Sequence, residues 1–408
     1  MEQIKSTNQK SFSNSQKWVI ASTAAGFSLE NMDIMFLSFS LTSIIASLHL
    51  SGMAAGWIGS ITNIGMLVGG AAFGLLGDRI GRVKTFSYTI FIFAFATGLM
   101  YFAHSLPMIY TMRFLAGIGA GGEYGVGMAL IAENFQQDHV GRMTSVAAIG
   151  GQVGAIIAAL LAAAIIPKFG WNTLFLLGII PVLLTYFIRR HLTESQEFLQ
   201  AKQIAQQQNQ TATFGQLFKT RQLFGQTLGL MIMTIVQIAG YFGLMNWLPS
   251  IVQQQQGLSI ASSSLWMIAT IIGMSIGMLV FGYLMDAAGP RLSFAVFLLG
   301  SASSMFVILA AHNSLTLILA GCLIGFFSNG MFGGYGAVIS QLYPAQIRST
   351  ANNLIMNVGR AIGGFSSVAI GFLMDRFNLT VTMGSLSALY ILSLLVMINL
   401  PGLKQLSK

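Results

Sequence analysis

The sequence has a single cysteine, Cys322, among 408 residues, and only 8% of its side chains are charged. One cysteine excludes a disulfide framework within the chain, and the apolar run around it indicates a buried, inert thiol. The sequence also lacks a phosphate-binding glycine loop, a cluster of metal ligands and a nucleophile placed beside a base, and its five histidines are scattered. We therefore expect no enzyme activity, no metal and no cofactor.

Apolar residues are abundant instead. Hydrophobic residues make up 54% of the chain, the mean hydropathy is +0.73, and there are 46 glycines. This composition is typical of proteins that cross the bilayer many times, and runs long enough to span roughly 30 Å of hydrocarbon recur along the whole chain. We expect an all-α membrane protein with twelve helices, at 18–46, 55–76, 85–104, 108–131, 143–166, 171–190, 222–247, 263–284, 292–311, 315–340, 349–374 and 381–400. The first run follows a polar tail and is too long for a cleavable signal peptide, so we interpret it as a retained helix.

The net charge of +9 is explained by the orientation of the chain in the membrane and does not indicate nucleic-acid binding. Sixteen of the 20 Lys and Arg residues fall in the two tails and in alternate loops. This asymmetry is the positive-inside pattern, and it predicts that both termini are cytoplasmic. We expect no nucleic-acid partner.

An internal repeat divides the chain in two. GLLGDRIGRVKTF (74–86) aligns with GYLMDAAGPRLSF (282–294) at an offset of 208 residues, which matches Asp78 to Asp286. The polar segment 191–220 separates six expected helices from six. We therefore expect an N-terminal bundle at 1–190, a cytoplasmic linker at 191–220 and a C-terminal bundle at 221–408. Parallel six-helix repeats are typical of transporters that move two bundles about a central site.

Three motifs carry a resemblance to a known family. GDRIGRVK (77–84) resembles the signature loop of the major facilitator superfamily. RFLAGIGAGGEYGVGMALIAENFQQDHVGR (113–142) resembles a pattern shared by its metabolite:proton symporters, sugar porters and organic-ion transporters. YPAQIRSTANNLIMNVGRAIGG (343–364) is similar to the matching segment of bacterial organic-acid symporters. The resemblance implies two pseudo-symmetric six-helix bundles, transport by alternating access and a place in a bacterial plasma membrane, and we expect a monomer.

Charges inside the membrane are costly, so each is a candidate for function. At about 1.5 Å of rise per residue, Asp33 lies roughly 22 Å up helix one and Arg113 roughly 8 Å below the outer face, so the two depths coincide. The resemblance to sugar porters implies that such a pair couples transport to protons; the alternative is a fixed structural pair. Glu30 lies one turn from Asp33 and joins the candidates, although it could simply face a water-filled cavity. Glu123 lies deeper on helix four, is expected to face the cavity and is a further candidate for titration.

The same arithmetic places Arg360 near the midplane, where it suits a substrate carboxylate. The alternative is that Arg360 pairs with Glu30 or with helix-end carbonyls. Gln152 is its counterpart in the repeat, so the two are expected to face each other across the cavity. Further candidates for substrate contact, each of which could instead hold helices together, are Asn357, Gln237, Asn329 and Tyr124.

At the cytoplasmic side the resemblance implies a charged gate. Its expected members are Asp78, Arg79, Arg82, Glu133, Arg142 and Arg348. In the second half Gln341 stands where the family has an acidic partner and Ala287 where it has the first arginine, so a weaker C-terminal gate is expected.

We therefore expect proton-coupled import of a small organic anion, such as an aromatic or sugar acid. Efflux of drugs or metabolites by proton antiport is an alternative, but it favours an acidic, aromatic cavity without a midplane arginine. Sugar:proton symport is another, and it favours a cavity richer in Gln, Asn and Trp than the one that this sequence predicts. A membrane sensor would add a soluble output domain, and no loop or tail is long enough for one.

Overall fold

The computed structural model describes residues 12–207, 212–256, 260–310, 313–377 and 379–406. Within these ranges all regular structure is helical. The first bundle contains α1 (Asn14–Leu48), α2 (Gly52–Ile80), α3 (Arg82–Leu99), α4 (Leu106–Asn134), α5 (Gln137–Phe169), α6 (Trp171–Leu176) and α7 (Pro181–His191). The second contains α9 (Arg221–Gln256), α10 (Ile260–Ala288), α11 (Pro290–Ser304), α12 (Ser314–Gly330), α13 (Phe332–Leu342), α14 (Arg348–Gly363), α15 (Ser366–Arg376) and α16 (Leu379–Asn399), followed by the short α17 (Pro401–Gln405).

Eleven helices among the described residues are long and apolar enough to cross a membrane, one fewer than the sequence predicts. The expected single helix at 349–374 is divided into α14 and α15. α14 ends at a pair of glycines, and Gly364 closes it by donating to the carbonyl of Arg360. The prediction of one continuous helix was therefore wrong, because two successive glycines and a polar sequence weaken the helix at this point.

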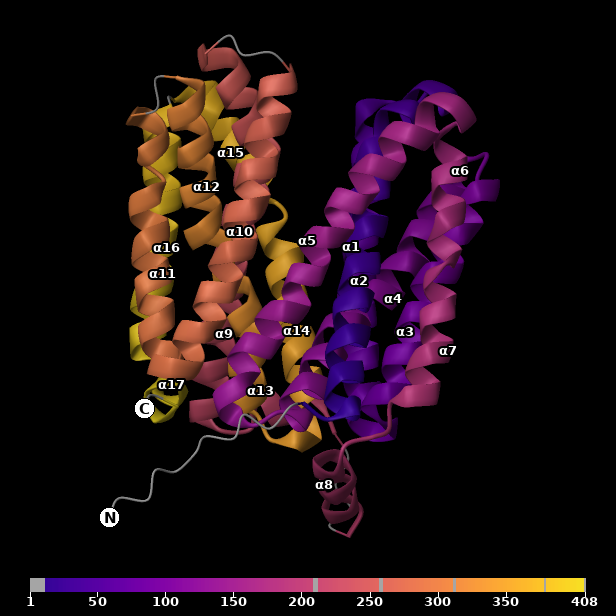
Figure 1. Ribbon diagram of the computed structural model, residues 1–408, viewed down its shortest axis with the longest axis vertical. Helices are drawn as coiled ribbons and strands as arrows, with labels where there is room; N and C mark the ends of the chain where they lie inside the picture. Colours follow the sequence, from indigo (N-terminus) through magenta and orange to yellow (C-terminus); the bar gives the residue numbers. More distant parts are fainter. Residues whose placement is uncertain (1–11, 208–211, 257–259, 311–312, 378, 407–408) are drawn as a thin grey trace, which may run out of the picture.

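The two bundles meet at one end and diverge at the other (Figure 1). They meet at the end that carries the linker helix α8 (Gln196–Gln207), which we call the linker end. One helix from each bundle reaches across: α5 packs on α10, and α14 packs on α2. These two contacts are related by the 208-residue repeat.

Glycines let α4 approach α2 closely. A Cβ at Gly121 would overlap the carbonyl oxygen of Met66, and one at Gly117 would overlap that of Thr62. Gly125, the third glycine of this stripe, lies against Asn353 of α14 instead. The stripe therefore serves a contact within the first bundle and another between the bundles.

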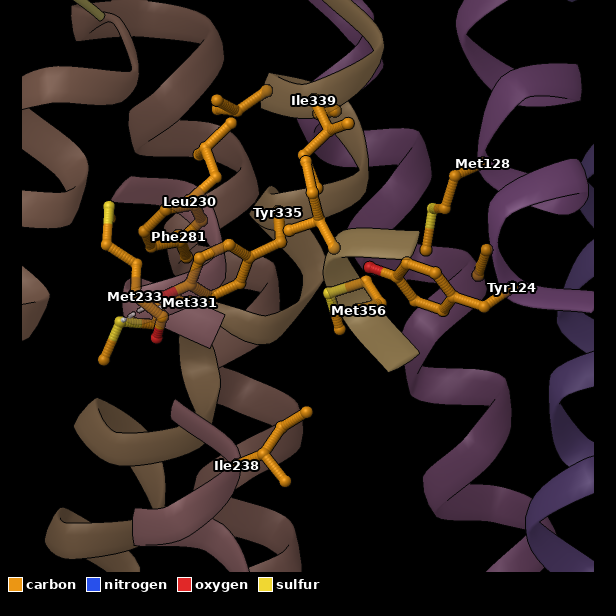
Figure 2. Packing of buried hydrophobic residues seen from close by; sticks show 14 of the residues in the cluster. Tyr124, Met128, Leu230, Met233, Ile238, Phe281, Met331, Tyr335, Ile339 and Met356 are labelled. Atoms are coloured by element: carbon orange, nitrogen blue, oxygen red, sulfur yellow. Dashed lines mark hydrogen bonds between the residues drawn. The ribbon is translucent and has the colours of Figure 1, made fainter. Parts of the chain in front are cut away.

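The buried core is continuous between the bundles near the linker end. Figure 2 shows Tyr124 and Met128 of the first bundle beside Met356 and Tyr335 of the second. All four are at most 1% exposed. Methionine adapts its shape to irregular gaps, which suits the surface between the two bundles.

Candidate functional site

A cavity of about 250 Å³ lies between the two bundles. α1, α2, α4 and α5 of the first bundle and α9, α12, α13 and α14 of the second contribute to its wall. Along α1 the lining runs from Glu30 to Ser38, away from the linker end. Polar and charged lining residues are Glu30, Asn31, Ser38, Thr62, Asn63, Arg113, Gln152, Gln237, Tyr241, Asn329 and Arg360.

Asp33 and Arg113 form the contact that their depths predict. Both terminal nitrogens of Arg113 donate to the carboxylate of Asp33, at 2.9 and 3.0 Å. Thr97 donates to the same carboxylate at 2.7 Å, and the Nε of Arg113 lies 3.3 Å from the hydroxyl of Thr62. Arg113 is fully buried and Asp33 is 4% exposed. The pair is therefore bidentate, shielded from water and contained within the first bundle.

Glu30 and Arg360 form a second ion pair, and this one joins the two bundles. Nη1 of Arg360 donates to Oε1 of Glu30 at 2.8 Å. The guanidinium also lies over the ring of Tyr124, 5.8 Å from its centre. Arg360 lies in the cavity wall, as the sequence predicts. Its pairing with Glu30 is the alternative that the sequence left open.

The carboxamide candidates divide into two groups. Gln152, Gln237 and Asn329 line the cavity, and Gln237 donates to Asn329 at 2.9 Å. Asn357 does not line the cavity. Its side-chain nitrogen donates to the carbonyl oxygen of Gly121 at 2.8 Å and so holds α14 against α4.

Tyr124, another expected substrate contact, does not line the cavity either, because its ring packs between those of Phe27 and Phe332.

Glu123 does not face the cavity, so this expectation was wrong. Its carboxyl group lies against Gly26 of α1, which the ring of Phe86 of α3 also approaches, and Glu123 is fully buried. Among the described residues neither oxygen has a hydrogen-bond partner. The charges of Glu30 and Arg360 are within electrostatic range. Because Gly26 has no side chain, α1 packs closely against α4 at this point. α1 therefore separates Glu123 from the cavity.

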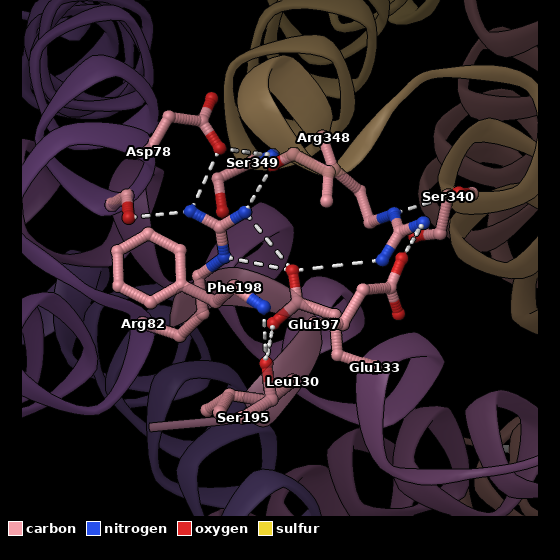
Figure 3. Close-up of polar contacts among 12 residues, drawn as sticks. Asp78, Arg82, Leu130, Glu133, Ser195, Glu197, Phe198, Ser340, Arg348 and Ser349 are labelled. Carbon is pink, nitrogen blue, oxygen red and sulfur yellow. Dashed lines mark hydrogen bonds and ion pairs between the residues drawn. The ribbon is translucent and has the colours of Figure 1, made fainter. Parts of the chain in front are cut away.

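An ion-pair network closes the linker end (Figure 3). Arg82 contacts Asp78 at 2.9 Å and Glu133 at 3.0 Å, and Arg348 of the second bundle lies 3.6 Å from the same Glu133. Arg82 also donates to the carbonyl of Ala345, which belongs to the second bundle. The expected gate residues Asp78, Arg82, Glu133 and Arg348 are thus brought together.

Two expected gate residues have other partners. Arg142 contacts Asp286 at 2.9 Å rather than joining Glu133. Arg79 donates to the carbonyl of Ala212 in the linker. Both side chains hold segments together at the linker end, but neither is part of the Glu133 network.

The linker contributes residues that the sequence analysis did not select. Glu194 accepts hydrogen bonds from the first backbone amides of α3, the shortest being 2.7 Å from Arg82. Ser195 donates to Glu133 at 2.7 Å, and Glu197 contacts Arg348 at 2.9 Å. Glu194 and Glu197 are the only two acidic residues in the segment 191–220, so the sequence could have marked them as candidates. Nothing in the sequence shows which groups they contact.

Two helical bundles that enclose a polar cavity and close at one end have the architecture of a secondary transporter. A family model described as Major Facilitator Superfamily matches residues 23–276 and 230–405. The chain belongs to this superfamily and is a multi-pass membrane transporter.

The chain is similar to several transporters of small molecules. The chain is 38% identical to a putative metabolite transport protein of Haemophilus influenzae, over 96% of this chain and 98% of the relative. It is 31% identical to a putative niacin/nicotinamide transporter of Bacillus subtilis, over 89% and 90%. It is 30% identical to a cis,cis-muconate transport protein of Acinetobacter baylyi, over 90% of each. The proton:xylose symporter XylE shares the fold, with a TM-score of 0.79 at 18% identity over 95% of this chain and 96% of that structure.

Proposed function

We propose that this transporter imports a small organic anion together with protons, across a bacterial plasma membrane and by alternating access. The observation that carries the proposal is Arg360, a guanidinium in the wall of the cavity between the bundles. Its Nη1 binds Glu30, while its remaining N–H groups have no partner among the described residues. A planar guanidinium with free donors suits a carboxylate, which it can bind through two parallel hydrogen bonds.

The names of several relatives support an acid as substrate. The relatives include transporters of cis,cis-muconate, sialic acid and benzoate, and each of these compounds carries a carboxylate. They differ in size and in the polar groups that surround the carboxylate. The acid group is what they share, and Arg360 is suited to bind it.

The cavity also favours additional polar groups on the substrate. Five carboxamides line it, at Asn31, Asn63, Gln152, Gln237 and Asn329. This richness in Gln and Asn is what sugar:proton symport would favour, so sugar transport is the second candidate. A neutral sugar gives Arg360 no charged partner, and we therefore favour an acid that carries hydroxyl, amide or ring-nitrogen groups.

Asp33 and Arg113 are proposed to carry the coupling to protons. A deprotonated Asp33 holds Arg113 in the bidentate pair, and a protonated Asp33 releases it. Because the pair joins α1 to α4, its state biases the arrangement of the helices around the cavity. Most of the basic residues in loops lie on the same side of the bundles as the linker. The positive-inside rule places that side in the cytoplasm, so we infer that a structure closed at the linker end is the outward-open state.

Uptake into proteoliposomes tests the proposal. The vesicles contain the purified protein, and an inward proton gradient is imposed in the presence of nicotinate, benzoate, cis,cis-muconate, N-acetylneuraminate or xylose. We expect accumulation of at least one acid. Arg360→Ala should lower it by about ten- to a hundredfold, since a hydrogen bond to a charged group contributes about 1.5–3 kcal/mol.

The matched control is Arg376→Ala, because Arg376 is an exposed arginine outside the cavity wall. Its uptake should equal that of the wild type. Accumulation of xylose alone would favour sugar symport, and acid uptake that survives Arg360→Ala would refute the role of Arg360.

A further inference from the structure

Arg360 has one carboxylate partner in this structure, and that partner belongs to the protein. Glu30 occupies Nη1 of the guanidinium, and the contact is 2.8 Å long. Both side chains lie in the wall of the cavity, where Arg360 is 17% and Glu30 5% exposed. A substrate carboxylate that binds Arg360 must therefore approach Glu30 as well.

Among the described residues, the cavity wall offers no second free cation to such a substrate. The basic residues that line the cavity are Arg113 and Arg360, and both terminal nitrogens of Arg113 are bound to Asp33. Two ionised carboxylates would then share one guanidinium between side chains that are mostly buried. Like charges at such short range repel each other strongly where water does not screen them.

We infer that Glu30 and the substrate carboxylate compete for Arg360, so that the site binds the organic anion only together with a proton on Glu30. This inference rests on the proposed function and deepens it, because it places a coupled proton in the binding step. A protonated Glu30 gives up the ion pair, and Arg360 then binds the substrate with the overall charge of the site unchanged. Asp33 retains its separate role in the arrangement of the helices.

Other charged and titratable groups face Glu30 and must be controlled for. They are Asp33 on the same helix, Arg113, Glu123 and Tyr124 on α4, and Arg360 on α14. Arg113 is held by Asp33 within the first bundle. Glu123 is buried outside the cavity wall. Glu30 is the carboxylate in contact with Arg360, which is why the competition is assigned to it.

The test measures binding to the purified full-length protein in lipid nanodiscs. The probes are nicotinate, benzoate, cis,cis-muconate and N-acetylneuraminate, titrated from about pH 5.5 to about pH 8.5, where their carboxylates stay ionised. For the wild type, the Kd of a bound acid should rise by up to tenfold per pH unit toward alkaline pH, as the uptake of one proton requires. Glu30→Gln should remove this dependence and bind at least tenfold tighter than the wild type at the alkaline end.

Two further variants keep the test decisive. Glu30→Asp retains a titratable group and should retain the pH dependence, which shows that position 30 tolerates substitution. Asp33→Asn should also retain it, since Asp33 does not contact Arg360. Asp138→Asn, an exposed carboxylate outside the cavity, is the control for the loss of a negative charge.

The outcomes separate this inference from the proposed function. If the wild type binds none of the four acids, the proposed function fails and this inference fails with it. If the wild type binds an acid and Glu30→Gln keeps the pH dependence, only this inference is overturned. Weaker acid binding by Glu30→Gln at every pH would also overturn it, because Glu30 would then support the site instead of competing for it.

Discussion

Asp78 and Asp286 occupy equivalent places in the two halves of the chain and bind equivalent backbone groups of the opposite bundle. Asp78 accepts hydrogen bonds from the amides of Ser349 and Thr350, at 3.1 and 2.8 Å. Asp286 accepts from those of Gly141 and Arg142, at 2.8 and 3.0 Å. Donors and acceptors are both related by the offset of 208 residues. The linker end is therefore closed by two symmetric carboxylates.

Asp78→Ala and Asp286→Ala should each weaken this closure. Hydrogen bonds to a charged acceptor contribute about 1.5–3 kcal/mol, so each change should shift the ratio of closed to open molecules by roughly ten- to a hundredfold. Electron–electron double resonance between spin labels on α2 and α14 measures the distance across the linker end. Asp138→Ala, an exposed carboxylate on α5, is the control. Unchanged distance distributions in both aspartate variants would contradict the prediction.

Asp33→Asn should uncouple transport from protons. The amide keeps hydrogen-bonding atoms for Arg113 and Thr97 but no longer changes its charge during the cycle. Accumulation of acid against a gradient should therefore be lost, while exchange of labelled for unlabelled substrate continues. Asp33→Glu, which keeps the charge, should retain some accumulation. Proton-driven accumulation at the wild-type rate in Asp33→Asn would remove Asp33 from the coupling role.

Glu123→Met should separate stability from transport. The buried carboxyl group lacks a hydrogen-bond partner among the described residues, and burying such a group costs roughly 1–3 kcal/mol. An apolar side chain of similar length should leave the melting temperature in detergent unchanged or higher. If Glu123 takes part in proton transfer near Glu30, proton-driven accumulation should fall in the same variant. A lower melting temperature would show that the carboxyl group stabilises the fold.

Gly69→Ala should destabilise the first bundle. A Cβ at Gly69 would overlap the backbone of Ile118 on α4, and backbone atoms cannot move aside as a flexible side chain can. Overpacking of this kind typically costs about 1–3 kcal/mol. The matched control is Gly56→Ala on the same helix, where a Cβ meets no atom within 4 Å. Thermal unfolding in detergent should show a lower melting temperature for Gly69→Ala only.

Depth along a helix could be predicted from the sequence, and the rotation of the helix could not. Residue counts place Asp33 and Arg113 at one depth, and their contact follows because α1 and α4 belong to one bundle. The same counts place Glu123 correctly on α4 but give no reliable direction for its side chain. Which helix covers Glu123 depends on the close approach of α1 at Gly26, and this approach depends on packing across many turns.

Contacts between residues of opposite bundles were even harder to predict from the sequence. The sequence marked Asp286 as the counterpart of Asp78, but the amides that it binds belong to α5, almost 150 residues away. The linker carboxylates Glu194 and Glu197 likewise have several basic residues among which the sequence does not choose. Pairings of this kind are chosen by the geometry of the assembled bundles.

The sequence by itself determined that the chain lies in a membrane, where most of its helices are and that its halves repeat. Apolar runs of this length match the thickness of a bilayer, and the offset of 208 residues can be found by aligning the chain with itself. Only the tertiary structure decided that Arg360 binds Glu30, that α14 ends at Gly363 and that Glu123 is sealed from the cavity. The physical reason is that a charge buried in a membrane protein must find its partner from the side chains that packing places beside it. Packing is a property of both bundles together.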